Sequence, residues 1–473
     1  MSVLDILLII ATVISTLLLF GLTVFVHELG HFIAARWMGL YVDRFAIGMG
    51  PVAYKFNRNG VEYSIRWLPL GGFVSIPQML PMESVEGKVE NLPKNLPPAE
   101  PLAKIVTAFF GPLFSLGLGF VAAILVFFAG KNVNVATLTT TIGYVDKDSP
   151  AYVAGIKPGD KIVSINGVQV KQWSGGSDSV WNLTLLGSSP KLKVVTEHDG
   201  QQVTYDLLRR PDPDPDVSKI PTVGFERYVA GPLEVDTLLK NYPAAMAGLK
   251  RGDILKKFNG QNLYSSWQLK DLIKQSKGPF ALDFERKGEM HSVTLSAVKI
   301  PGLEKEEMGV GIRWKGGPYQ VMHPNPLQQV RDSLEMMVLT IKALVTPKSG
   351  IGIQQMSGPL GIFHMIFNMI MDGDFRLLLS FCVFFNVNLA VLNLFPFPIL
   401  DGGHIVFSCI EAIRRRPLDV KVINALMTCS MVLLLFFFLM VTFYDSGRVG
   451  RDIKSSSILS KEKNALEKIE TTE

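Results

Sequence analysis

The stretch Phe25-Val26-His27-Glu28-Leu29-Gly30-His31-Phe32 closes an uncharged apolar run that begins at Ile6. It has the pattern H-E-x-x-H. On a helix the two histidines lie one turn apart on the same face, where two imidazole nitrogens can bind one Zn²⁺. Glu28 can take a proton from a water molecule at that metal. Because ionisable side chains at membrane depth are costly, three of them at the end of an apolar helix predict a functional site.

The composition predicts a membrane protein with more than one domain. The chain has 473 residues, is 48% hydrophobic and has a formal net charge of +5. This charge is mild, and no basic, aromatic-rich tract indicates a nucleic acid partner. The three cysteines lie in or beside apolar segments near the C-terminus, so we expect neither a disulfide framework nor a cysteine zinc site. The N-terminus lacks the basic region of a signal peptide, and we interpret the first apolar run as a retained span.

Four uncharged apolar runs are each long enough to cross a bilayer. They are Ile6–Val26, Ile105–Gly130, Leu377–Leu400 and Val422–Tyr444. Basic residues are concentrated between the first and second runs and between the third and fourth. The positive-inside rule therefore predicts that both connections are cytoplasmic and both termini lie outside. The Lys-rich C-terminal tail argues against this orientation, but the first connection decides it. His27 and His31 are then expected at the cytoplasmic end of the first span.

The residues after the first run favour β structure. The cluster Ala46–Pro51 breaks a helix, and alternating residues on both sides of Asn59-Gly60 predict a hairpin. Leu70–Val74 can supply a further strand. Two interpretations remain open: a small cytoplasmic sheet, or a β element whose edge pairs with an extended substrate.

A repeat occupies the polar middle of the chain. Ser149–Gly167 and Tyr242–Gly260 share the pattern A-G-[IL]-x-x-G-D, a short apolar strand and N-G. This pattern predicts a short helix that stops at Gly, a turn, a strand and a hairpin turn. It resembles the PDZ domain, twice in tandem, a module that binds extended peptides by strand addition. We expect the first groove strand to follow Thr141–Val145, while the corresponding stretch of the second module, near Leu233–Val235, lacks the Gly.

The third apolar run ends in the stretch Asn393-Leu-Phe-Pro396-Phe-Pro398-Ile-Leu-Asp401-Gly402-Gly403-His404. Its prolines and glycines predict unwound backbone, which is tolerated at membrane depth only inside protein or beside water. Asp401 needs a partner there, and a metal shared with the histidine pair would leave one coordination position open, as in catalytic zinc sites. His404 is the rival ligand, but a capping or outer role is favoured for it. The Asn side chains can hold a substrate backbone or polarise its carbonyl, whereas Asn386 is expected to form interhelical hydrogen bonds.

H-E-L-G-H in the first run, N-x-x-P-x-P-x-L-D-G in the third and the tandem PDZ insert together resemble the site-2 protease family over nearly the whole chain. Gly48–Pro51 and Pro69–Val74 also resemble the family's membrane-associated β region. The resemblance implies one Zn²⁺ per chain, with Glu28 as the catalytic base. The implied metal ligands are His27, His31 and Asp401, and the residues expected to contact substrate are Asn388, Asn393, Gly48, Gly50, Pro396 and Pro398. One departure is Ser115, where the family's motif A-G-P-x-x-N has Asn; we expect this change to affect packing and not chemistry.

The expected fold is a polytopic α-helical membrane protein with four transmembrane helices, a membrane-associated β-hairpin or sheet, and two mainly β PDZ domains between spans two and three. The expected segments are 1–40 (first span), 41–76 (β region), 77–104 (cytoplasmic loop), 105–130 (second span), 133–222 and 223–320 (PDZ domains), 321–375 (amphipathic helix and loop at the membrane surface), 376–412 (third span), 413–444 (basic loop and fourth span) and 445–473 (periplasmic tail).

The expected function is hydrolysis of a peptide bond inside a transmembrane segment. The resemblance implies a bacterial inner-membrane protein with periplasmic PDZ domains and an active site near the cytoplasmic side. It also implies single-pass substrates, such as an anti-sigma factor already trimmed in the periplasm, and remnant signal peptides, with the PDZ pair as a size filter. The alternative is a non-catalytic PDZ scaffold in the membrane, with a structural metal or none. The intact Glu28 and the open coordination position favour the enzyme, and a transporter is disfavoured because the halves show no inverted repeat.

Overall fold

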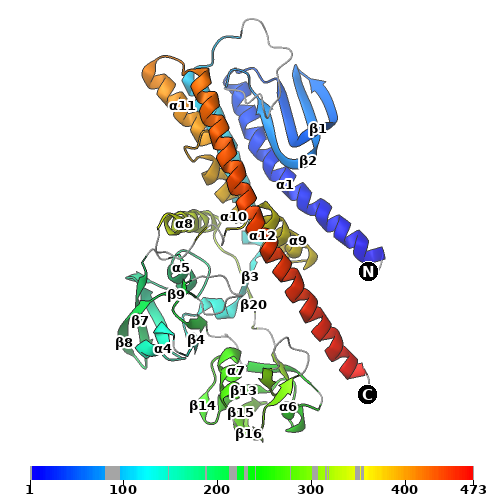
Figure 1. Ribbon diagram of the computed structural model, residues 1–473, viewed down its shortest axis with the longest axis vertical. Coiled ribbons are helices and arrows are strands. Elements are labelled where there is room, and N and C mark those ends of the chain that lie inside the picture. Colours follow the sequence, from blue (N-terminus) through cyan, green and yellow to red (C-terminus); the bar gives the residue numbers. More distant parts are fainter. Residues whose placement is uncertain are drawn as a thin grey trace. The chain divides into compact units, whose positions relative to one another are not determined.

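The computed structural model describes residues 3–79, 96–147, 149–186, 189–211, 221–227, 233–239, 241–276, 278–300, 307–314, 317, 319–346, 352 and 356–471. The chain divides into two compact units (Figure 1). The first unit contains residues 1–131, 323–337 and 357–447, and the second contains residues 132–322, 338–356 and 448–473.

Four helices in the described part of the chain are long and apolar enough to cross a membrane, as predicted. They are α1 (Val3–Trp37), α3 (Pro101–Ala129), α10 (Phe375–Asn393) and α12 (Val420–Thr471), whose candidate span ends at Gly447. Shorter helices are α8 (Pro326–Val345), α9 (Pro359–Met371) and α11 (Asp401–Arg414). The predicted third span is helical only to Asn393, and residues 394–400 form the non-helical turn that its prolines predict. Gly402 and Gly403, by contrast, lie within the first turn of α11.

The first unit is built around α3, which packs against α1, α10 and α11. Small residues allow α1 and α3 to approach closely, because a Cβ on Gly30 would collide with the main chain of Phe110. A Cβ on Gly111 would collide with the imidazole of His31. The helix that carries the H-E-x-x-H motif is thus fixed against α3 at the motif itself.

A β-sheet lies beside α1, formed by β1 (Arg44–Arg58) and β2 (Val61–Ser75) (Figure 1). The hairpin turns at Asn59-Gly60, both with positive φ, as predicted. Residues 44–47 of β1 pair with residues 62–65 on one side and with residues 72–75 on the other. Residues 72–75 are therefore an outer strand of this sheet in the described part of the chain. Among the residues predicted to break a helix, Gly48 and Gly50 have positive φ where the β1–β2 register shifts.

The second unit contains two β modules with separate cores. The first module has the sheet order β6-β5-β7-β8, a separate pair of β4 and β11, and the short helices α4 and α5. Its elements are β4 (Ile142–Val145), α4 (Pro150–Ala154), β5 (Lys161–Ile165), β6 (Val168–Gln169), α5 (Val180–Leu185), β7 (Lys191–His198), β8 (Gln201–Leu208) and β11 (Phe225–Arg227).

The second module has the sheet order β16-β15-β13-β12-β19, with β14 paired to β13. Its elements are β12 (Leu233–Leu238), α6 (Pro243–Met246), β13 (Ile254–Phe258), β14 (Gln261–Asn262), α7 (Ser266–Gln275), β15 (Phe280–Arg286), β16 (Glu289–Leu295) and β19 (Ile312–Trp314). The smaller elements of the unit are β3 (Lys131–Asn134), the 3₁₀ helix η1 (Val135–Leu138), β9 (Arg210–Pro211), β10 (Pro221–Thr222), β17 (Val298–Ile300), β18 (Glu307–Gly309) and β20 (Tyr319–Met322).

The repeated residues build turns. Each Asn-Gly pair has positive φ at both positions, as a two-residue hairpin turn requires. The carboxylate of Asp160 accepts a hydrogen bond from the main-chain N–H of Lys157 at 2.9 Å, and Asp253 accepts the equivalent bond from Lys250 at 2.7 Å. The G-D motif therefore closes the turn before β5 and before β13.

The expected boundary between the modules at residues 222 and 223 is wrong, because β11 pairs with β4 of the first module. In the second module, β19 pairs with β12 in the same way. Both closing strands begin in a V-G-[FI] sequence whose glycine, Gly224 or Gly311, has positive φ and close neighbours. The V-G-[FI] repeat is hard to recognise in the sequence because it lies far along the chain from each A-G-[IL]-x-x-G-D motif. The predicted loop at 77–104 lies outside the described residues between 80 and 95.

Candidate metal centre

His27 and His31 occupy consecutive turns of α1, and their Nε2 atoms lie 3.2 Å apart. The helix is regular at this point, so the i, i+4 spacing alone brings both rings to one face. Both side chains are largely buried. The geometry predicted from the H-E-x-x-H spacing is present.

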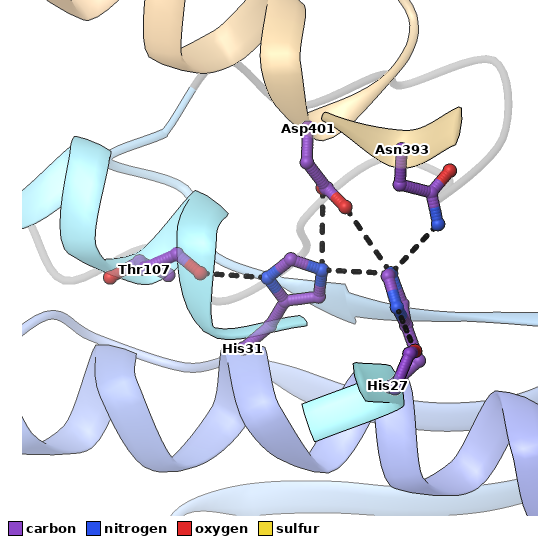
Figure 2. Close-up of polar contacts among 6 residues, drawn as sticks. His27, His31, Thr107, Asn393 and Asp401 are labelled. Atoms are coloured by element: carbon purple, nitrogen blue, oxygen red, sulfur yellow. Dashed lines mark hydrogen bonds and ion pairs between the residues drawn. The ribbon is translucent and has the colours of Figure 1, made fainter. Parts of the chain in front are cut away.

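Asp401 approaches this pair from the first residue of α11 (Figure 2). Its Oδ2 lies 3.3 Å from His27 Nε2, and its Oδ1 lies 3.3 Å from His31 Nε2. Among the described residues, these three form the one group of His, Cys, Asp or Glu side chains close enough to hold a metal ion. A stretch of chain 370 residues from His31 thus completes the group.

The turn before Asp401 is compact because two glycines allow it. A Cβ on Gly402 would collide with the main-chain carbonyls of Leu394 and Phe395, and a Cβ on Gly403 would collide with that of Phe397. The N–H of Gly403 donates to the Leu400 carbonyl at 2.9 Å. These contacts fix where α11 begins and hence where the Asp401 carboxylate lies.

Both imidazoles are held at their second nitrogen by residues of α3. His31 Nδ1 lies 2.8 Å from the main-chain oxygen of Thr107, and His27 Nδ1 lies 3.0 Å from Ser115 Oγ. A carbonyl oxygen can only accept, so His31 carries its proton on Nδ1 and directs the Nε2 lone pair toward Asp401. Nε2 is then the atom of His31 that is available to a metal ion held together with Asp401.

The donor set fits zinc. Two imidazole nitrogens and one carboxylate are typical catalytic zinc ligands that leave a fourth position open. Donor atoms at about 2.0–2.1 Å from a tetrahedral zinc are about 3.3 Å apart, and the three measured separations are 3.2, 3.3 and 3.3 Å.

Glu28 and the outer strand of the sheet line the same cavity, which has a volume of about 870 Å³. A Cβ on Gly72 would touch Glu28 Cγ at 3.0 Å, so this glycine lets the sheet approach the glutamate. Phe73 and Val74 follow along the cavity wall, and Asn393 Nδ2 lies 3.5 Å from His27 Nε2. The cavity places three potential ligands, a carboxylate and an outer strand of the sheet around one space.

Not every predicted site residue reaches this cavity. Gly50 and Asn393 line it, whereas Gly48, Asn388, Pro396 and Pro398 are not among its lining residues. The Asn388 amide donates to the Phe384 carbonyl of its own helix at 2.7 Å. The helix periodicity explains this difference, because residues 388 and 393 lie on different faces of α10.

For two further residues, Asn386 and Ser115, the structure differs from the expectation. Asn386 donates to the Cys382 carbonyl within its own helix at 2.9 Å and not to another helix. His404 is not part of the ligand group; its N–H donates to the Leu400 carbonyl in the first turn of α11. Ser115, expected to matter only for packing, contacts His27 directly. The signal for Ser115 was its departure from the family motif, whereas the Thr107 carbonyl has no signal in the sequence.

Known proteins similar to this chain include metalloproteases. The model of peptidase family M50 matches residues 15–437. A protein of Neisseria meningitidis named "Putative zinc metalloprotease" is 30% identical over 443 residues, which are 89% of this chain and 96% of that protein. The regulator of sigma-E protease RseP of Escherichia coli K12 is 29% identical over 453 residues, 92% of this chain and 98% of its own. The solved PDZ domain of an SdrC-like protein from Listeria monocytogenes is 22% identical and covers 17% of this chain and 84% of its own, with a TM-score of 0.16.

Proposed function

Because the chain belongs to peptidase family M50, the site-2-type metalloproteases, we propose that it hydrolyses peptide bonds within transmembrane segments at the His27, His31 and Asp401 centre. The observation that carries this proposal is the convergence of three zinc-type ligands and Glu28 on one cavity between membrane-length helices. We propose one Zn²⁺ per chain, with these three residues as its ligands.

Zinc at this centre supplies Lewis-acid activation of water and of the scissile carbonyl. Glu28 accepts the proton of the attacking water and returns it to the leaving nitrogen. The Asp401 carboxylate offsets part of the metal's charge and holds α11 toward α1. Ser115 and Thr107 keep both imidazoles turned toward the metal.

A transmembrane substrate hides its carbonyls in helical hydrogen bonds and must unwind before cleavage. We propose that residues 72–75 pair with the unwound backbone, because they form an outer strand that reaches the cavity wall. Asn393 holds the backbone beside the metal, as its position 3.5 Å from His27 Nε2 allows.

We propose single-pass membrane proteins as substrates, after a first cut outside the membrane. Two relatives are named regulator of sigma-E protease RseP. We propose an anti-sigma factor as one substrate and remnant signal peptides as others. The four candidate spans describe a multi-pass membrane protein. The basic connections support the proposed location in a bacterial inner membrane, with the active site near the cytoplasmic side and the PDZ modules and both termini in the periplasm.

Replacement of Glu28 by Gln tests the catalytic proposal. We expect cleavage of a tagged model span to fall about 10²- to 10⁴-fold, because the proton acceptor is lost while its shape is kept. Zinc content should stay at the wild-type level, since Glu28 is not a ligand. A Glu28→Gln protein that still cleaves at the wild-type rate would exclude this mechanism.

Removal of the PDZ modules tests their role as a size filter. Strands β3 and β20 pair with each other, so the two ends of the insert lie side by side and residues 135–318 can be replaced by a short linker. The shortened protein should cleave untrimmed substrate, which the full chain leaves intact. If both proteins spare untrimmed substrate but cut trimmed substrate equally well, the modules are not the filter.

A further inference from the structure

His27 and His31 of the metal centre each meet a partner on α3 at the Nδ1 atom, but the two partners are of different kinds. His31 meets a main-chain oxygen, that of Thr107, which no substitution removes. His27 meets the hydroxyl of Ser115, a side chain that is fully buried. His31 thus depends on a main-chain acceptor, whereas the orientation of His27 depends on the side chain at position 115 of α3.

The proton positions on His27 follow from its neighbours. Nε2 of His27 faces the ligand group, 3.3 Å from Asp401 Oδ2 and 3.2 Å from His31 Nε2, and a metal bound there takes its lone pair. The proton then lies on Nδ1, and Ser115 Oγ accepts it across 3.0 Å. This is the tautomer that a metal ligand at Nε2 requires.

Because α1 and α3 approach each other closely, the short side chain of Ser115 can reach His27. Gly111 precedes Ser115 by one helical turn, and a Cβ there would collide with His31. Helix α3 therefore lies near enough for a one-carbon side chain to reach the ring of His27.

We propose that Ser115 is a positioning residue for zinc: its hydroxyl accepts the Nδ1 proton of His27 and so fixes the ring with Nε2 toward His31 and Asp401. This inference rests on the proposed function, because it takes His27 as a zinc ligand. It assigns to Ser115 a role in metal affinity and not only in helix packing. Partners of this kind change metal affinity about 10- to 100-fold when they are removed from other metal sites.

The test measures zinc affinity on the full-length protein in detergent, by competition with a chelator, together with the visible spectrum of the Co²⁺-substituted protein, which reports the ligand geometry. Ser115→Ala should weaken zinc binding about 10- to 100-fold and change the Co²⁺ spectrum. Ser115→Thr keeps the hydroxyl, and Ser115→Asn supplies an amide oxygen as acceptor; at least one of them should restore most of the affinity.

Ser333→Ala is the matched control. Ser333 is also buried in the first unit, and its hydroxyl donates to the Gln329 carbonyl of its own helix. This variant should bind zinc as the wild type does. The unfolding temperature of each metal-free variant separates a loss of packing from a loss of metal affinity.

Wild-type affinity and spectrum in Ser115→Ala would overturn the proposal. So would equal weakness in Ala, Thr and Asn variants, because the acceptor would then not be the cause. A different result tests the proposed function itself: if the wild type binds no zinc, or His27→Ala retains it, His27 is not a ligand and the zinc proposal fails first.

Discussion

Helix α1 brings His27 and His31 to the metal centre from regular backbone, whereas the segment between α10 and α11 brings Asp401 from a turn that interrupts a membrane-length apolar run. In α1, the 3.6-residue period sets the spacing of the two rings, and no other contact is needed for it. At Asp401, the position depends on how closely Gly402 and Gly403 pack on the main chain of residues 394–397. The difference teaches that the spacing of the two histidines follows from the helix alone, while the position of Asp401 depends on specific contacts of a turn.

The largest difference should follow from adding one methyl group to each region. Gly402→Ala places a Cβ against the carbonyls of Leu394 and Phe395 and must displace α11, whereas Gly21→Ala in α1 meets nothing within 4 Å. Because a misplacement of about 1 Å can cost about 10²-fold in rate, we expect cleavage to fall at least about a hundredfold in Gly402→Ala and to remain unchanged in Gly21→Ala. Equal activity in the two variants would mean that the turn does not set the position of Asp401.

A second glycine-to-alanine substitution tests the half of the metal centre that α1 provides. Gly111→Ala adds a Cβ against the His31 imidazole, while Gly117→Ala on the same helix meets nothing within 4 Å. We expect zinc affinity to fall about tenfold in Gly111→Ala, since the ring must turn away from its Thr107 partner. Chelator competition measures this affinity. Unchanged affinity would show that α1 can shift to accommodate the ring, and the contrast with the turn would then be even larger.

Asn393 lies between the two regions, at the last turn of α10 before the break. Asn393→Ala should lower kcat/KM for a model span about tenfold, the effect of one lost hydrogen bond to a charged or strongly polarised group. Zinc content should stay unchanged. Asn388→Ala should have a smaller effect, because that amide donates within its own helix. The reverse order of effects would identify Asn388 as the residue closer to the substrate.

The smallest effect on the site is expected from a change outside both regions. Burial raises the pKa of Asp253, but the two hydrogen bonds from Arg286, both at 2.7 Å, lower it more, so that its pKa lies below the usual range. A carboxyl whose folded pKa is depressed adds stability above its unfolded pKa of about 3.9 and loses that stability as the pH falls toward the folded value. Arg286→Gln should therefore lower the unfolding temperature of the second module at pH 7 and flatten its decline below about pH 4. Zinc affinity should not change; if it does, the module and the metal centre are coupled.

The sequence predicts those parts of the molecule that depend on local patterns. The spans, the hairpin at Asn59-Gly60 and the repeated turns before β5 and β13 follow from hydropathy, from residues with positive φ and from a motif that occurs twice. The convergence of His27, His31 and Asp401 was also expected, because an unpaired carboxylate at membrane depth needs a partner.

What the sequence does not predict depends on contacts between distant segments. β11 closes the first module from beyond its expected boundary, and its pairing with β4 across about 80 residues cannot be recognised from either segment alone. Ser115 meets His27 because α1 and α3 cross at Gly30 and Gly111, and the pairing of these two glycines cannot be recognised from either segment alone. The direction of the Asn388 amide depends on the rotation of α10, which packing against α3 fixes.

The most direct test concerns the metal centre that α1 and the turn before α11 form together. It compares zinc content and cleavage in the wild type, His27→Ala and Asp401→Ala. Metal analysis of the purified full-length protein, paired with cleavage of a tagged model span, measures both properties on one sample. The account predicts about one zinc per chain in the wild type, and a loss of zinc and cleavage in Asp401→Ala as large as that in His27→Ala. An Asp401→Ala protein that retains its zinc and cleaves like the wild type would show that α1 alone holds the metal, and would contradict the account.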